Sequence, residues 1–325
     1  MKNIIPAVLV ALFLVACNGG SSKKNRYVPE SSGKINNLSV VVDNELWEDT
    51  VGEAIRNVLA RPLEGLPQEE PLFSLSQMPT QVFSGFATKN RTVLKIEKGK
   101  PKATKILSDV YARPQTVVLV TGQTNAEIVE QLNTNAKKII DAFKKTEIKE
   151  KQRQIALSLF DDKPLQDSLG IRLNFPTAYR LAKTGDHFFW IRKSIETGTM
   201  DLMVYQVPLS AIRKGDSAVT DIVRLRDSIG KKYIEGRFEG TYLTTESAYA
   251  PYIFETIIDN KPTYETKGIW DVKNDFMSGP FINYAVEDKV NNRYVILEGY
   301  VFAPSIEKRN YVFELEAIIK SLRIK

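Results

Sequence analysis

Length, composition and charge limit the kinds of protein that this chain can be. It has 325 residues, with 45 Lys or Arg against 39 Asp or Glu, one Cys and one His. The net charge of +6 is mixed along the sequence, and no basic helix with interleaved aromatic residues appears, so we expect no nucleic-acid partner. A single cysteine excludes an intramolecular disulfide and a zinc site built on several thiolates. Hydrophobic cores must therefore stabilise the fold.

The first residues have the pattern of an export signal. Met1-Lys2-Asn3 precedes a run from Ile4 to Ala16 that is apolar apart from Pro6. This run is too short to span a hydrocarbon core of roughly 30 Å. A basic start, an apolar middle and a small residue before the cleavage point are typical of a secretory signal peptide, which we predict over residues 1–16.

The only cysteine follows this apolar run directly. The sequence Leu14-Val15-Ala16-Cys17 resembles the lipobox of bacterial lipoproteins. The resemblance implies that signal peptidase recognises Leu14, Val15 and Ala16 and cleaves before Cys17, whose thiol carries acyl chains such as palmitate. Two or three such chains hold a protein lastingly at a bilayer, because each buried methylene contributes about 0.8 kcal/mol. We expect a protein that is anchored to a membrane by lipid and does not span it.

The next segment is predicted to be a lipidated flexible linker over residues 17–37. It is rich in Gly, Ser, Lys and Asn and has few apolar residues. A flexible chain of about 20 residues has an r.m.s. span of roughly 25 Å, which would hold a folded domain just off the membrane surface.

Apolar periodicity predicts an N-terminal domain over residues 38–163. Thr124 and Glu127 have the spacing of a capping box, which marks the start of its longest helix. The pattern predicts, in chain order, a strand at 38–42, a helix at 46–59, strands at 92–97 and 116–121, and an amphipathic helix from 124 to about 160.

A C-terminal domain is predicted over residues 164–325. Its clearest feature is a hairpin in which two alternating runs meet at Asn291-Asn292, residue types that tolerate the positive φ of a tight turn. The pattern predicts strands at 171–175, 187–193 and 200–209, a helix at 219–234, the hairpin at 279–304 and a final helix at 310–323. Irregularly mixed strands and helices indicate an α+β fold, with two mixed antiparallel-sheet and helix halves.

Catalytic and metal-binding patterns are largely missing from the sequence. Neither the H-E-x-x-H nor the C-x-x-C spacing of zinc sites occurs, so His187 is interpreted as a turn residue at the start of a strand, and no metal is expected. The G-x-S-x-G elbow and the glycine-rich nucleotide loops are absent as well, so no cofactor is expected. Carboxylate pairs could serve glycoside hydrolysis, although solvated acids are the simpler interpretation of Asp161-Asp162, Glu69-Glu70 and Glu287-Asp288.

Two other features suggest binding or modification. Tyrosines on one sheet face can stack on a glycan or peptide while their hydroxyl groups form hydrogen bonds. The candidates for such a face are Tyr242, Tyr249, Tyr252, Tyr284, Tyr294 and Tyr300, which are otherwise half-buried sheet residues. Asp167-Ser168-Leu169 and Asp216-Ser217-Ala218 resemble the sequon by which Bacteroidota glycosylate exported proteins, which would modify Ser168 and Ser217; helix caps and turns are the alternative.

Longer segments resemble a known family. "NELWEDTVGEAIRNVLARPLEGLPQEEPLFSLSQMP", "VFSGFATKNRTVL" and "TKGIWDVKNDFMSGPFINYAVED" are similar to the Bacteroidota lipoproteins of domain of unknown function family 4837, and the resemblance runs from about Ile35 to the end. It implies export, acylation at Cys17 and an envelope setting, with no established activity. Surface-bound lipoproteins of that phylum tend to carry acidic residues after the cysteine, whereas here the neutral to basic "NGGSSKKN" follows Cys17. We therefore expect the protein to be located at the periplasmic face of the outer membrane.

Three hypotheses on function remain open. The first is a non-enzymatic envelope lipoprotein that binds an envelope protein or glycan, or supports assembly. The second is a carboxylate-dependent hydrolase acting on envelope glycans or peptides, and the third is a small-ligand binding module that uses the tyrosine-rich sheet.

Overall fold

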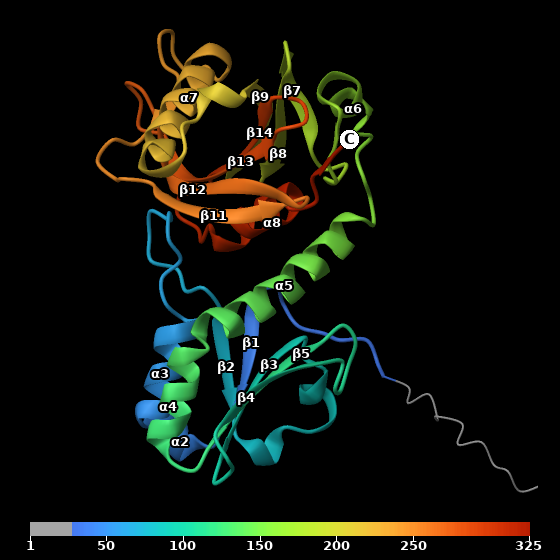
Figure 1. The fold of residues 1–325 in the computed structure, drawn as a ribbon, viewed down its shortest axis with the longest axis vertical. Coiled ribbons are helices and arrows are strands. Elements are labelled where there is room, and N and C mark those ends of the chain that lie inside the picture. The colour runs from blue at the N-terminus through green and yellow to red at the C-terminus, as the bar shows by residue number, and fades with distance from the viewer. Residues whose placement is uncertain (1–27) are drawn as a thin grey trace, which may run out of the picture.

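The structure, a computed structural model, describes residues 28–325. The predicted signal peptide with Leu14, Val15, Ala16 and Cys17 lies outside the described residues. Figure 1 shows two domains along the long axis of the molecule, joined by the helix α5 (Ala136–Ile155). Within residues 28–325, no helix is both long and apolar enough to cross a membrane.

The first domain is built on a five-stranded sheet with the order β2-β1-β3-β5-β4, in which only β4 is antiparallel to its neighbour. Helices pack apolar side chains against one face, and the chain around two 3-10 turns covers the other. The elements are β1 (Asn37–Val41), α2 (Asn44–Glu48), α3 (Thr50–Leu59), β2 (Ser74–Met78), η1 (Thr80–Val82), η2 (Gly85–Lys89), β3 (Thr92–Lys98), β4 (Ala103–Ser108), β5 (Thr116–Gly122) and α4 (Asn125–Thr134).

Both helices predicted in this domain are interrupted. Asp49 separates α2 from α3 because its carboxylate accepts a 2.6 Å hydrogen bond from the backbone N–H of Thr50 and so starts a new helix. Asn135 separates α4 from α5 in the same region of the sequence where one long helix was expected. The predicted cap at Thr124 is confirmed, since its hydroxyl accepts from the N–H of Glu127 at 3.2 Å.

The second domain is built on an antiparallel sheet with the order β10-β12-β13-β14-β9-β8-β7, and β11 pairs with β12 at the edge. Its core on one face contains α8, and that on the other face contains α7. The elements are α6 (Lys163–Leu169), β6 (Ile171–Arg172), β7 (Arg180–Gly185), β8 (Phe188–Ile195), β9 (Gly198–Pro208), η3 (Leu209–Ala211), η4 (Gly215–Ser217), α7 (Ala218–Tyr233), β10 (Leu243–Thr245), β11 (Tyr252–Ile258), β12 (Lys261–Val272), β13 (Ser278–Asp288), β14 (Arg293–Phe302), α8 (Arg309–Ile319) and β15 (Arg323–Ile324).

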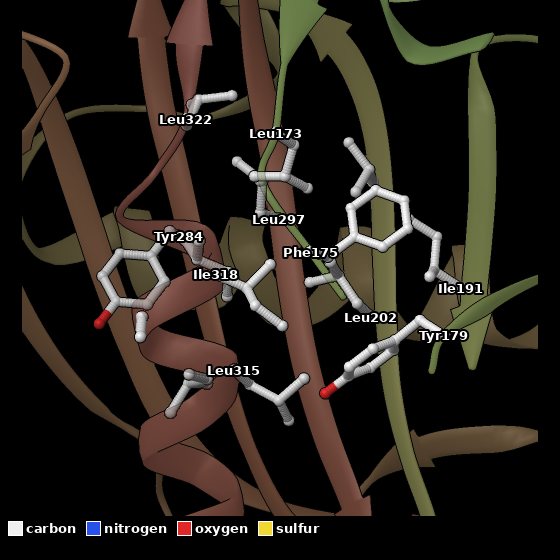
Figure 2. Packing of buried hydrophobic residues seen from close by; sticks show 14 of the residues in the cluster. Leu173, Phe175, Tyr179, Ile191, Leu202, Tyr284, Leu297, Leu315, Ile318 and Leu322 are labelled. Carbon is white, nitrogen blue, oxygen red and sulfur yellow. The ribbon is translucent and has the colours of Figure 1, made fainter. Parts of the chain in front are cut away.

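Figure 2 shows how α8 covers its face of the sheet. Leu315 and Ile318 of α8 lie beside Leu297 of β14, and Phe175 lies beyond them. The predicted hairpin is confirmed as β13 and β14, with Asn292 at a φ of 51° in the turn. The α+β fold class is therefore confirmed, although the two domains have different sheet topologies.

The end of the predicted linker does not behave as a linker. The N–H of Ser31 donates to the carbonyl of Arg113 at 3.0 Å, and the N–H of Ser32 donates to the carbonyl of Lys89 at 2.9 Å. Asn36 is buried, and its N–H reaches the carboxylate of Glu147 at 3.2 Å. Placing all of residues 17–37 in a flexible segment was therefore wrong for its last residues, because their backbone groups are paired with the first domain.

Helices α5 and α8 join the two domains through polar contacts. Gln152 of α5 donates to the carbonyl of Ala317 at 3.0 Å, and the ammonium of Lys151 lies 3.3 Å from the carboxylate of Glu314. Both contacts are between part-buried groups, where hydrogen bonds hold their partners in one geometry.

Candidate functional site

Two hollows lie on either side of the edge strand β11, and residues Glu255, Thr256 and Ile257 of this strand line both. The first, of ≈ 830 Å³, is called here the tyrosine cleft. The second, of ≈ 990 Å³, is called the inter-domain groove, because α3 and α5 of the first domain and β11, β12 and α8 of the second contribute to it. Concave sites at domain interfaces are where proteins most often bind ligands.

The tyrosine cleft contains a buried carboxylate between two lysines. The Glu287 carboxylate lies 3.1 Å from the ammonium of Lys214 and 3.9 Å from that of Lys289. Burial, followed by the nearby charge of Glu287, raises the pKa of Tyr294 to about 12. The Tyr294 hydroxyl is therefore neutral at physiological pH and can donate a hydrogen bond. Tyr264 of β12 completes this aromatic lining.

The inter-domain groove is bordered by an ion-pair network around Glu316 of α8. Lys320 lies 2.5 Å and Lys144 lies 3.8 Å from the Glu316 carboxylate, and the latter contact joins the two domains. Burial raises the pKa of Glu316, but Lys144, Lys320 and Lys267 together lower it by more, so its pKa lies well below its ordinary value. Lys267 itself pairs with Glu265 at 2.9 Å. The border is thus charged yet largely neutralised.

The six candidate tyrosines do not share one sheet face. Tyr284 packs in the core on the α8 side of the sheet, whereas Tyr294 and Tyr300 pack on the α7 side, and all three are buried. Tyr249 and Tyr252 are exposed, and Tyr242 is half-buried beneath the ammonium of Lys231. The single tyrosine platform expected from the sequence is wrong, because side chains alternate between the two faces of each strand.

Most of the candidate carboxylate pairs contain an acid that accepts structural hydrogen bonds. Glu70 accepts from two backbone N–H groups at the start of α8, and Asp162 accepts from the N–H of Leu173 at 2.9 Å. Asp288 accepts from Arg293 at 2.9 Å, while its neighbour Glu287 lines the tyrosine cleft. None of these neighbouring pairs places both of its carboxylates in one hollow.

The remaining candidates lie in turns and helix ends. His187 has a φ of 49° in the turn before β8, as expected, and its Nδ1 lies 3.1 Å from the carbonyl oxygen of Ser168. Ser168 is in α6 and Ser217 directly precedes α7, both half-buried. Across residues 28–325, no group of three or more His, Cys, Asp or Glu side chains could hold a metal ion.

The strand that carries both hollows is not among the elements predicted from the sequence. Neither the place of β11 at the sheet edge nor the contribution of Tyr264 to the tyrosine cleft was predicted. A signal was present: Asp259-Asn260 separates two alternating runs by two residues, which is the pattern of a tight hairpin.

Two family matches divide the chain. The family Domain of unknown function (DUF4837) matches residues 158–321, and Domain of unknown function (DUF8532) matches residues 31–156. The resemblance that was expected from about Ile35 to the end is therefore shared between two families. No curated protein matches this chain.

Two solved structures are similar over parts of the chain. One is a crystal structure at 1.50 Å resolution from Bacteroides thetaiotaomicron VPI-5482, with 11% identity and a TM-score of 0.27 over 48% of this chain and 45% of that one. The other is the Ran-binding protein Mog1p of Saccharomyces cerevisiae, with 8% identity and a TM-score of 0.31 over 47% of this chain and 89% of that one. The chain thus spans less than half the length of the first of these proteins.

Proposed function

Because the chain belongs to the DUF4837 family of domains of unknown function, we propose its role from its own sequence and geometry. The proposed function is that of an acylated cell-envelope lipoprotein that binds a partner and catalyses no reaction. It would be held through lipid on Cys17 at the periplasmic face of the outer membrane. Its partner would occupy the two hollows beside β11.

One observation carries this proposal: β11 separates two hollows that together involve both domains. The groove combines apolar side chains such as Phe254 and Ile257 with lysines of α5, a mixture that suits a polypeptide or another amphipathic partner. A flexible lipid tether would leave this surface free to meet partners in the envelope.

The hydrolase alternative has less support from the described residues. Glycoside hydrolysis needs two carboxyl groups on either side of one bond. Glu287 is buried in the tyrosine cleft, but the other acid lining it, Glu255, is exposed on β11, and Asp288 is engaged with Arg293. We therefore favour binding over hydrolysis.

Site-specific photo-crosslinking in cells tests the proposal. A photoreactive phenylalanine analogue replaces Ile257, whose side chain is 71% exposed, and the matched control replaces Leu107, which is exposed on the edge strand β4 of the other sheet. We expect a discrete crosslinked product from position 257 and none from position 107. Identical patterns from both positions would refute the placement of the binding site.

A hydrolase assay provides the opposite test. Purified protein that cleaves peptidoglycan fragments, together with an inactive Glu287→Gln variant, would establish the enzymatic alternative instead.

A further inference from the structure

We propose that β11 binds an extended, acidic segment of a partner polypeptide as one more strand of the second-domain sheet. This inference rests on the proposed function and specifies what would occupy the two hollows. It starts from the backbone of the edge strand, whose pairing with β12 leaves one side open.

The hairpin geometry identifies the open backbone groups. Ile258 pairs with Lys261 across the two-residue turn Asp259-Asn260, in which φ is 50° and 58°. In such a turn the flanking pair exchanges hydrogen bonds, and bonded and non-bonded pairs then alternate along the strands. Pro262, which has no N–H, falls opposite Ile257 at a non-bonded pair, which agrees with this register.

It follows that Ile253, Glu255 and Ile257 direct their backbone N–H and C=O groups away from β12. Within residues 28–325, no strand pairs with this side of β11, and no backbone hydrogen bond reaches these three residues from a loop. They form a short row of donors and acceptors at the spacing that an added strand requires.

Two other sheet edges of the molecule, those formed by β7 and β4, are protected against pairing. The opposite edge strand, β7, has a register shift between Leu181 and Lys183, and β4 carries the exposed Lys105. Bulges and edge lysines are the usual means by which proteins prevent strand addition. β11 contains no Lys, no Pro and no register shift, and it exposes Tyr252, Phe254 and Ile257 at 51%, 40% and 71%. This edge is therefore left competent to pair.

The two hollows lie where the side chains of an added strand would go. Ile253 packs toward the α7 side of the sheet, and Ile258 packs toward the α8 side. Because side chains alternate along a strand, those of the partner would enter the tyrosine cleft and the inter-domain groove in turn. This explains why both hollows share the central residues of β11.

Charge selects an acidic segment. Lys145 and Lys149 of α5 line the groove and are exposed, and no carboxylate among residues 28–325 lies within 4.0 Å of either ammonium. The cleft gives no such preference, because Lys214 and Lys289, each 67% exposed, are balanced there by Glu287 and by Glu255 of β11. Acidic side chains that enter the inter-domain groove would meet Lys145 and Lys149, whereas basic side chains there would meet like charge.

A defined peptide tests the inference on the full chain in detergent micelles. The probe is a capped heptapeptide of alternating Glu and Val, and the control replaces each Glu by Lys. We expect the acidic peptide to bind at least about tenfold more tightly. Its binding should slow amide hydrogen exchange at Ile253, Glu255 and Ile257. Two further peptides carry N-methyl groups on alternate amides, one on the odd and one on the even positions. Only the peptide whose methyl groups block the amides that face β11 should fail to bind.

Two substitutions at position 257 test the contributions of the backbone N–H and of the side chain separately. Ile257→Pro removes one outward N–H without removing a hydrogen bond to β12, and should weaken the acidic peptide at least about tenfold. Ile257→Val keeps the N–H and should bind like the wild type. If the proline variant fails to fold, Lys145→Glu with Lys149→Glu provides the second test, because it should weaken the Glu peptide and strengthen the Lys peptide.

The outcomes distinguish this inference from the proposed function. If the acidic peptide binds without slowing hydrogen exchange at the three β11 amides, strand addition is overturned, but the hollows remain a binding site for a partner. Dimerisation that Ile257→Pro abolishes would identify a second copy as the occupant and overturn the acidic partner. No peptide binding, combined with a crosslink from position 257 in cells, would overturn strand addition alone, whereas the loss of that crosslink as well would overturn both.

Discussion

The carboxylate of Glu70 accepts a 2.7 Å hydrogen bond from the backbone N–H of Arg309, although 239 residues separate them in the chain. Its other oxygen accepts from the N–H of Lys308 at 2.7 Å. The Arg309 guanidinium returns a 2.8 Å hydrogen bond to the carbonyl of Pro71. A loop of the first domain thus caps the first turn of α8 in the second.

Removal of this cap is predicted to destabilise the molecule. Glu70→Ala leaves two buried N–H groups without acceptors, so we expect the free energy of unfolding to fall by about 1–3 kcal/mol. Urea unfolding monitored by tryptophan fluorescence measures this. Glu69→Ala is the matched control, because Glu69 is exposed. Equal effects of the two substitutions would contradict the capping role.

The buried Arg226 and Glu298 form a second testable pair. The guanidinium lies 2.7 Å from the carboxylate and 3.9 Å above the ring centroid of Phe281, and both charged side chains are fully buried. Glu298→Leu alone removes the buried partner of this cation, which keeps only the half-buried Asp227 at 3.3 Å, and should cost about 3–5 kcal/mol. Adding Arg226→Met should recover much of that loss in thermal or urea unfolding. A double variant as unstable as the single one would show that the surrounding network, and not the unpaired charge, sets the cost.

The pKa of Glu316 predicts a loss of stability in acid. Since Lys144, Lys320 and Lys267 hold the folded-state pKa below its ordinary value of 4.5, the folded state binds fewer protons than the unfolded state. The contribution of Glu316 is present above pH 4.5 and is lost as the pH falls below it. As the pH is lowered below 4.5, the urea concentration at the midpoint of unfolding should fall less steeply for Glu316→Gln than for the wild type. Glu239→Gln, at an exposed position, should retain the wild-type slope.

The anchor is tested by acyl labelling in cells. Cys17→Ser should leave an uncleaved precursor and abolish incorporation of a fatty-acid probe, because acylation requires the thiol. Ser21→Ala, four residues further along the linker, should be labelled like the wild type. Labelling that persists without the thiol would rule out the lipobox interpretation.

Modification of the two serines is tested by intact mass. If Ser168 and Ser217 carry glycans, Ser168→Ala and Ser217→Ala should each reduce the measured mass by one glycan. A wild-type mass equal to that of the acylated polypeptide would contradict modification at both positions.

Periodicity in the sequence determined most of the strands and helices of this protein. The buried runs at 92–97 and 116–121 became β3 and β5, and the Asn291-Asn292 hairpin joined β13 to β14. These features depend on residues close together in the chain, where alternation and turn chemistry act directly. Helix boundaries were harder to predict, since Asp49 and Asn135 interrupt amphipathic patterns that continue across them.

The sequence alone also predicts an export signal and a lipobox and contains no recognisable catalytic motif, because each of these is a local pattern. Only the tertiary structure decided which acids are used to cap helices, which tyrosines are buried on opposite faces, and which strand remains at the edge. Glu70 and Arg309 meet because two domains pack, and β11 is open because no further strand in residues 28–325 follows it in the sheet. Such relationships depend on contacts between distant segments, which local periodicity does not encode.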